Sequence, residues 1–109
     1  MLTLHLFRLK YLIVMKNEFV LQHWIDFTYG RQSEVTELHS AILFYLVFFS
    51  NRTNKSTLSI PYFKLLQHIG CNDIDKLKKS IKDLTDWGFL DMRNFNPDYY
   101  ILTFDFYLF

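Results

Sequence analysis

TLSIPYFKLLQHIGCNDIDKLKKSIKDLTDWGFLD, residues 57–91, decides the fold that we expect for this chain. TLSI is a candidate for a short strand. Pro61 suits the first turn of the helix that follows, because the N–H that proline lacks would have no partner there. This helix, YFKLLQHI, is expected to end at Gly70 and to turn three apolar side chains inward: Phe63, Leu66 and Ile69.

A second helix is expected after a short turn. Asn72 is a good N-cap for it, and two acids, Asp73 and Asp75, fall in its first turn, where the helix dipole favours them. Its apolar residues recur at intervals of three and four and form a single stripe: Ile74, Leu77, Ile81 and Leu84. Gly88 turns the chain out of this helix. Two strands are expected next, at 89–95 and 99–109, joined by a turn at 96–98.

Two further helices are expected upstream. The first covers residues 17–29 and stops at Gly30. The second covers residues 34–50, with Ser33 as its cap and Glu34 and Glu37 in its first turn. Residues 41–49 are all apolar, which fits a helix buried nearly all round or a buried strand. Length and the acidic first turn favour the helix, and residues 51–56 then form a polar loop.

Residues 1–16 are interpreted as an N-terminal extension of a domain at residues 17–109. The start, MLTLHLFRLKYLIV, lacks the basic leader and the small-residue cleavage site of a signal peptide, and it is too short to span a bilayer. An equally acceptable interpretation places the natural start at Met15, with the first 14 residues an upstream extension of the reading frame.

The composition predicts a surface that associates with something. The chain has 109 residues, enough for one domain with one core, and 19% of them are aromatic, including 12 Phe and 7 Tyr. So many rings are hard to bury in a small body, and both faces of the last expected strand are largely apolar. We therefore expect a second copy or a protein partner to cover part of this aromatic surface.

Charge is divided along the chain although the net charge is only +1. Residues 51–82 contain seven basic and two acidic residues, a local net charge of +5. Residues 83–109 contain one basic and five acidic residues, a local net charge of −4, and the first 50 residues balance. The positive charge therefore coincides with the two central helices, while the total charge argues for no general attraction to nucleic acid.

The order helix, strand, helix, helix and β-hairpin is that of a winged helix-turn-helix, an α+β and mostly α fold, here with an extra N-terminal helix. The ending LTDWGFLDM resembles the end of winged-helix recognition helices. Together with HWIDFTYG and HSAILFYLVFFSNRTNK upstream, the stretch Phe19–Phe104 resembles the N-terminal domain of DnaD-like and replication-initiator-like proteins of bacterial mobile elements and phage. The resemblance implies DNA binding in replication initiation or transcription regulation. It equally implies an oligomerisation or protein-interaction module without direct DNA binding, because DnaD-like N-terminal domains also serve that purpose.

The second central helix carries the main candidate site. With its apolar stripe inward, Asn72 and Lys76 are expected near base edges of duplex DNA, and Lys79 and Lys82 on phosphates. The alternative is a solvated face with ion pairs four residues apart, Asp75–Lys79, Lys79–Asp83 and Lys82–Asp86, each contributing about 0.3 kcal/mol.

Other basic residues could contact the DNA backbone. Arg52 and Lys55 flank the first strand and are expected to contact phosphate or, equally, to belong to a polar surface loop. Arg93 is expected near the tip of the hairpin, where it would touch the backbone or the minor groove.

No pattern for catalysis, a metal or a cofactor is found. The four histidines have no metal-ligand spacing, and no Ser/His/Asp order, glycine-rich phosphate loop or HExxH motif occurs. The aromatic residues are interpreted as core rather than as a stacking platform for single-stranded DNA. We expect no enzyme, small-molecule substrate or membrane partner. The single cysteine, Cys71, excludes an internal disulfide and fits a reducing, cytoplasmic setting.

Overall fold

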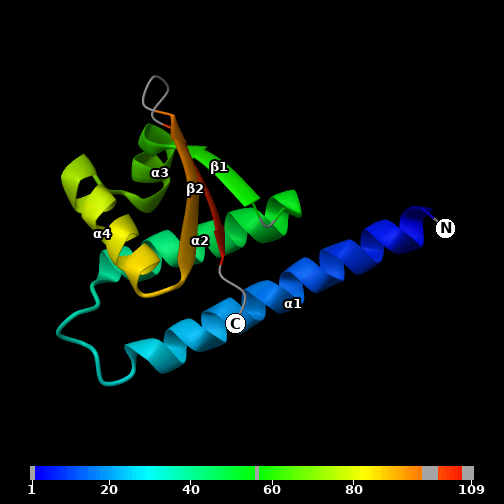
Figure 1. The fold of residues 1–109 in the computed structure, drawn as a ribbon, viewed down its shortest axis with the longest axis horizontal. Helices are drawn as coiled ribbons and strands as arrows, with labels where there is room; N and C mark the ends of the chain where they lie inside the picture. The colour runs from blue at the N-terminus through cyan, green and yellow to red at the C-terminus, as the bar shows by residue number, and fades with distance from the viewer. Residues whose placement is uncertain (1, 56, 97–100, 107–109) are drawn as a thin grey trace.

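The computed structural model describes the backbone of residues 2–55, 57–96 and 101–106, and the side chains of residues 15–55 and 57–91. The fold is α+β and mostly helical, as the sequence predicts (Figure 1). Its elements, in chain order, are α1 (Leu2–Thr28), α2 (Glu37–Thr53), β1 (Thr57–Pro61), α3 (Tyr62–Ile69), α4 (Ile74–Asp86), β2 (Leu90–Asn96) and β3 (Ile101–Phe106).

The three strands form one antiparallel sheet in the order β1-β3-β2. The last strand of the chain therefore lies in the middle, with Leu58 of β1 opposite Phe104 on one side and Leu90 of β2 opposite Phe106 on the other. The pairing of β2 with β3 shifts between Met92 and Asn94, which marks a bulge in the hairpin. The side chains of both faces of β3, expected to be apolar, lie outside the described part.

Helix α1 is longer than the sequence predicts. It runs without a break from Leu2 to Thr28, whereas the sequence predicts a helix that begins at residue 17. No proline or glycine interrupts residues 2–29, which removes the two strongest helix breakers from the proposed boundary. The chain turns after the helix at Gly30, where φ is +79°, a conformation that glycine adopts without strain.

Helix α2 starts and ends later than expected. Thr36, not Ser33, is the N-cap: its hydroxyl accepts the His39 N–H, and the His39 ring accepts the Thr36 N–H. The helix continues through the predicted loop to Thr53 and ends at Asn54 in the left-handed conformation. The expectation of burial nearly all round is wrong, because Phe44 and Phe48 are exposed.

Helices α3 and α4 have nearly the expected bounds but differ in detail. Phe63, expected inward, is 63% exposed, whereas Leu66 and Ile69 are partly buried against the core as expected. The fully buried residues of α3 are Tyr62 and Leu65. The N-cap of α4 is Asp73 rather than Asn72, since the Asp73 carboxylate accepts the N–H groups of Asp75 and Lys76. Both glycine stops, Gly70 and Gly88, have the positive φ that was expected.

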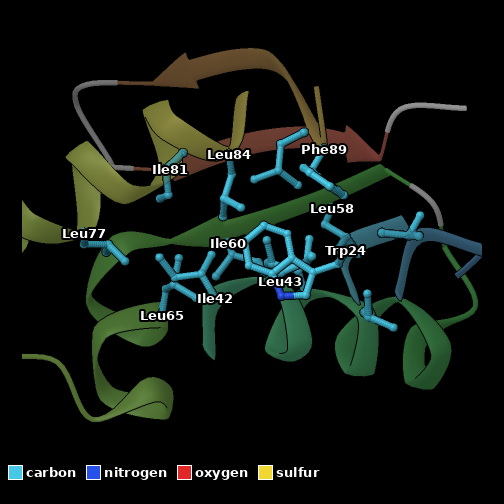
Figure 2. Close-up of a cluster of buried hydrophobic side chains, with 14 of the residues drawn as sticks. Trp24, Ile42, Leu43, Leu58, Ile60, Leu65, Leu77, Ile81, Leu84 and Phe89 are labelled. Carbon is cyan, nitrogen blue, oxygen red and sulfur yellow. The ribbon is translucent and has the colours of Figure 1, made fainter. Parts of the chain in front are cut away.

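One hydrophobic core joins the helices to the inner side of the sheet (Figure 2). Leu77, Ile81 and Leu84 of α4 meet the buried face of α2, and Ile74 lies at the edge of the stripe with 36% exposure. Helix α1 joins this core through Val20 and through Trp24, whose indole N–H donates to Ser40 Oγ at 3.2 Å.

A second, polar connection fixes α1 to the far end of α2. Asn17, 1% exposed, donates from Nδ2 to Ser50 Oγ at 3.0 Å and to Asn51 Oδ1 at 2.6 Å. The Ser50 hydroxyl then donates to the Lys55 carbonyl at 2.6 Å, just before β1. Buried hydrogen bonds of this kind are costly to break, because the groups would lose their partners without gaining water. Helix α1 is therefore held both near its end and near its middle.

Candidate nucleic-acid interface

Helix α4 exposes a row of lysines on the side opposite the core. The interior turns of the helix place Leu77, Ile81 and Leu84 inward, so Lys76, Lys79 and Lys82 reach solvent. Lys78 lies on the flank towards α3, where its Nζ is 5.6 Å from the centre of the Tyr62 ring. Burial raises the pKa of Tyr62 above its ordinary value.

The segment from Lys76 to Lys82 contains four lysines and no acid. The acids of α4 flank this segment: Asp73 caps the helix, Asp75 precedes the lysines, and Asp83 and Asp86 follow them. The predicted ion pairs Asp75–Lys79, Lys79–Asp83 and Lys82–Asp86 do not form among the described side chains. The middle of α4 is thus available to an anionic ligand.

Asp83 is held away from the lysines by a histidine of α2. His39 is 3% exposed, and its Nε2 lies 2.9 Å from Asp83 Oδ2. The Thr36 backbone N–H can only donate, so His39 Nδ1, 2.9 Å away, must accept. Nε2 therefore carries a ring hydrogen and is the hydrogen-bond donor to Asp83. This contact fixes the start of α2 against α4.

A shallow groove of about 650 Å³ lies between the start of α2 and α4. Lys76, Lys79 and Asp83 belong to one wall, and Glu34, Thr36 and Glu37 to the other. A neighbouring groove of about 420 Å³ shares Lys76 and Glu37 and adds Asn72 from the turn before α4. Positive and negative side chains thus face the same hollow, and the two glutamates would repel a phosphate that approaches Lys76.

The structure brings together part of the predicted site. Asn72, Lys76 and Lys79 border these two adjoining grooves, and Lys82 is exposed on the same helix. Arg52 and Lys55 lie at the other end of α2 (Figure 1); thirteen residues of helix separate Arg52 from His39, about 20 Å at 1.5 Å per residue. Arg93 belongs to β2, but its side chain lies outside the described part.

Sequence reasoning missed the histidine at the centre of this region. The four histidines were tested only for metal spacing, whereas His39 acts as a cap and as the partner of Asp83. A signal was present: Thr36 and His39 have the spacing of a capping box, in which the residue three positions after the cap is normally Glu or Gln. The role of Glu34 and Glu37 in lining the groove had no comparable signal.

Within the described residues, no group of three or more His, Cys, Asp or Glu side chains could hold a metal ion. In the same part of the chain, none of the helices combines the length and the apolar character needed to cross a lipid bilayer. No family model, curated protein or solved structure matches this chain.

Proposed function

We propose that residues 36–106 form a winged helix-turn-helix domain that binds duplex DNA, with α4 as its recognition helix. The order α2, β1, α3, α4, β2, β3 and the antiparallel sheet β1-β3-β2 support this assignment. In this arrangement α2 and α3 are the supporting helices, and the β2–β3 hairpin is the wing. The resemblance to DnaD-like and replication-initiator-like domains favours a role in replication initiation or transcription regulation of a mobile element.

The observation that carries the proposal is the acid-free lysine segment on the exposed side of α4. Its lysines project from a helix whose opposite side is fixed by Leu77, Ile81 and Leu84, so they are presented by a rigid support. DNA affinity at moderate salt derives largely from such contacts with phosphates, because each contact releases condensed counterions. The low net charge of +1 does not argue against DNA binding, because the lysines of α4 are the charges that would contact the phosphates.

The roles of the individual residues follow from their positions. Asn72 and Lys76 stand at the start of α4, the end of a recognition helix that usually approaches base edges in the major groove. Lys79 and Lys82 follow one and two turns later and suit phosphate contacts. Arg52, Lys55 and Arg93 are assigned at most to outlying phosphate contacts.

A titration of a fluorescent 20-base-pair random duplex at 50 and 200 mM salt tests the proposal. Affinity is expected to fall steeply with salt, with a logarithmic slope of about −0.9 per phosphate contact. The double variant K76A/K79A should lower the magnitude of this slope by about 1 to 2. K64A, which removes an exposed lysine of α3, is the control and should keep the wild-type slope. Wild-type binding by K76A/K79A would refute the assigned face.

A second candidate function is favoured by a different observation. Phe44, Phe48 and Phe63 are 49%, 58% and 63% exposed, and large aromatic side chains at the surface are typical of protein-interaction sites. On this reading the domain is an oligomerisation or docking module. A protein that fails to bind the duplex at 50 mM salt but associates with itself in solution would support this second function over the first.

A further inference from the structure

The outer side of α1 carries apolar side chains that this chain does not cover. Phe19 and Ile25 are 65% and 58% exposed, and Met15 is 37% exposed. They lie on the side of the helix opposite Val20 and Trp24, which are buried. Met15, Phe19 and Gln22 also border a small groove of about 260 Å³. The spacing 15, 19 and 22 is that of one helical stripe, the pattern of a helix that packs against another helix.

Helix α1 also extends beyond the body of the protein. Its 27 residues span about 40 Å, and its blue N-terminal part passes beyond the other elements in Figure 1. The described anchors of α1, Asn17 and Trp24, belong to its second half.

The charges of α1 indicate which partner fits. Residues 2–16 contain Arg8, Lys10 and Lys16 and no acid, whereas residues 17–28 contain Glu18 and Asp26 and no lysine or arginine. A second α1 aligned in parallel would oppose like charges. An antiparallel α1 would oppose the basic half of each copy to the acidic half of the other.

We propose that the outer side of α1 is a pairing surface for a second copy of this chain, with the two α1 helices antiparallel about a two-fold axis beside residue 17. This alignment opposes Lys16 of each copy to Glu18 of the other, and Arg8 to Asp26. It also opposes Met15 of each copy to Phe19 of the other, so these two exposed side chains cover each other. Such an interface is isologous, the usual form in homodimers. It rests on the second candidate function, for which it assigns α1 rather than the aromatic residues of α2 and α3 as the surface, and it stands whether or not α4 binds DNA.

Light scattering on the full chain tests the pairing. The expected mass is twice the 13.3 kDa of one chain, and F19E should reduce it to that of a monomer, because a carboxylate would be buried in the stripe. Q67E is the matched control: Gln67 is an exposed residue of α3, so this variant adds the same charge away from α1 and should remain a dimer. K76A/K79A should also remain a dimer, which separates this test from that of DNA binding. A monomeric wild-type chain would overturn the proposal, as would a dimer that F19E leaves intact.

Disulfide cross-linking tests the orientation. In a C71S background, E18C should cross-link to its own copy, since the two Glu18 positions flank the axis. D26C should not, because nine residues on each side of the axis place the two Asp26 positions about 27 Å apart along the helices. Cross-linking of both variants would indicate a parallel pair and contradict the assignment, and cross-linking of neither would contradict the interface.

Discussion

At the scale of the residue, His39 links three parts of the structure through one imidazole ring. It completes the cap of α2 with Thr36, donates to Asp83 of α4, and packs against Trp87 with 4.8 Å between ring centres. No other described side chain connects the start of α2 to the end of α4 by a hydrogen bond. The ring itself is buried, whereas the Asp83 side chain is 30% exposed.

His39→Ala should therefore lower the free energy of unfolding by about 2 kcal/mol, measured by urea denaturation. Loss of the cap accounts for about 1 kcal/mol, and loss of the bond to a partly exposed carboxylate for a further 1 kcal/mol or so. His39→Gln is the control, because Gln at this position preserves the capping box and should recover about half of the loss. If His39→Ala is as stable as the wild type, the assigned hydrogen bonds have no energetic role.

At the scale of the element, Asn72 and Asp73 are both candidates for the N-cap of α4, and Asp73 is the N-cap in the structure. Asn72 and Asp73 are both good capping residues, so composition alone could not decide between them. The turn after Gly70, where the Cys71 N–H donates to the Leu66 carbonyl, delays the helix by one residue and places Asp73 at the cap. Local residue types predict that a helix starts here, whereas the geometry of the preceding turn decides where.

Asp73→Ala is expected to destabilise the protein by about 1 kcal/mol, because two N–H groups of α4 lose their acceptor. Asn72→Ala should change the stability by less than about 0.5 kcal/mol, as for an ordinary surface position. Thermal or urea unfolding of the two variants measures the difference. Equal losses, or a larger loss for Asn72→Ala, would restore Asn72 as the cap.

Helix α3 has the predicted bounds, and Leu66 and Ile69 pack against the core as predicted, but Phe63 is exposed and Tyr62 and Leu65 are the buried residues. Pro61 directly precedes this helix and Gly70 directly follows it, which is why its bounds, residues 62–69, could be predicted. Its rotation was ambiguous, because two stripes are apolar: one contains Tyr62 and Leu65, the other Phe63 and Leu66. Which stripe is buried depends on the direction in which the chain leaves β1. A helix of eight residues has too few turns for its sequence pattern to show which stripe faces the core.

At the scale of the whole molecule, the sequence indicated the layout of helices and strands but not the neighbours of the candidate site. Patterns of three and four residues and glycine stops are local signals, and they predicted α4 and its outward lysines. The pairing of α4 with the start of α2 is a long-range contact, so neither the groove nor the glutamates opposite Lys76 could be read from spacing.

These glutamates predict an effect on DNA affinity. The double variant E34Q/E37Q removes the two negative charges that face Lys76 and Lys79, and the affinity for random duplex should rise about threefold at 50 mM salt, where screening is weak. The same titration as for the wild type measures the gain. An affinity equal to that of the wild type would show that the groove does not meet DNA.

The buried chain of hydrogen bonds from Asn17 through Ser50 to the Lys55 carbonyl has a consequence for any assembly built on α1. Because it prevents α1 from rotating against the rest of the chain, a pair of copies would display its two α4 helices at one invariant separation. Two-fold symmetry would then demand a palindromic target, in which the gap between half-sites is a fixed number of base pairs. Inserting half a helical turn of DNA between the two half-sites would move one half-site to the opposite side of the duplex. The second α4 of the pair could then no longer reach it.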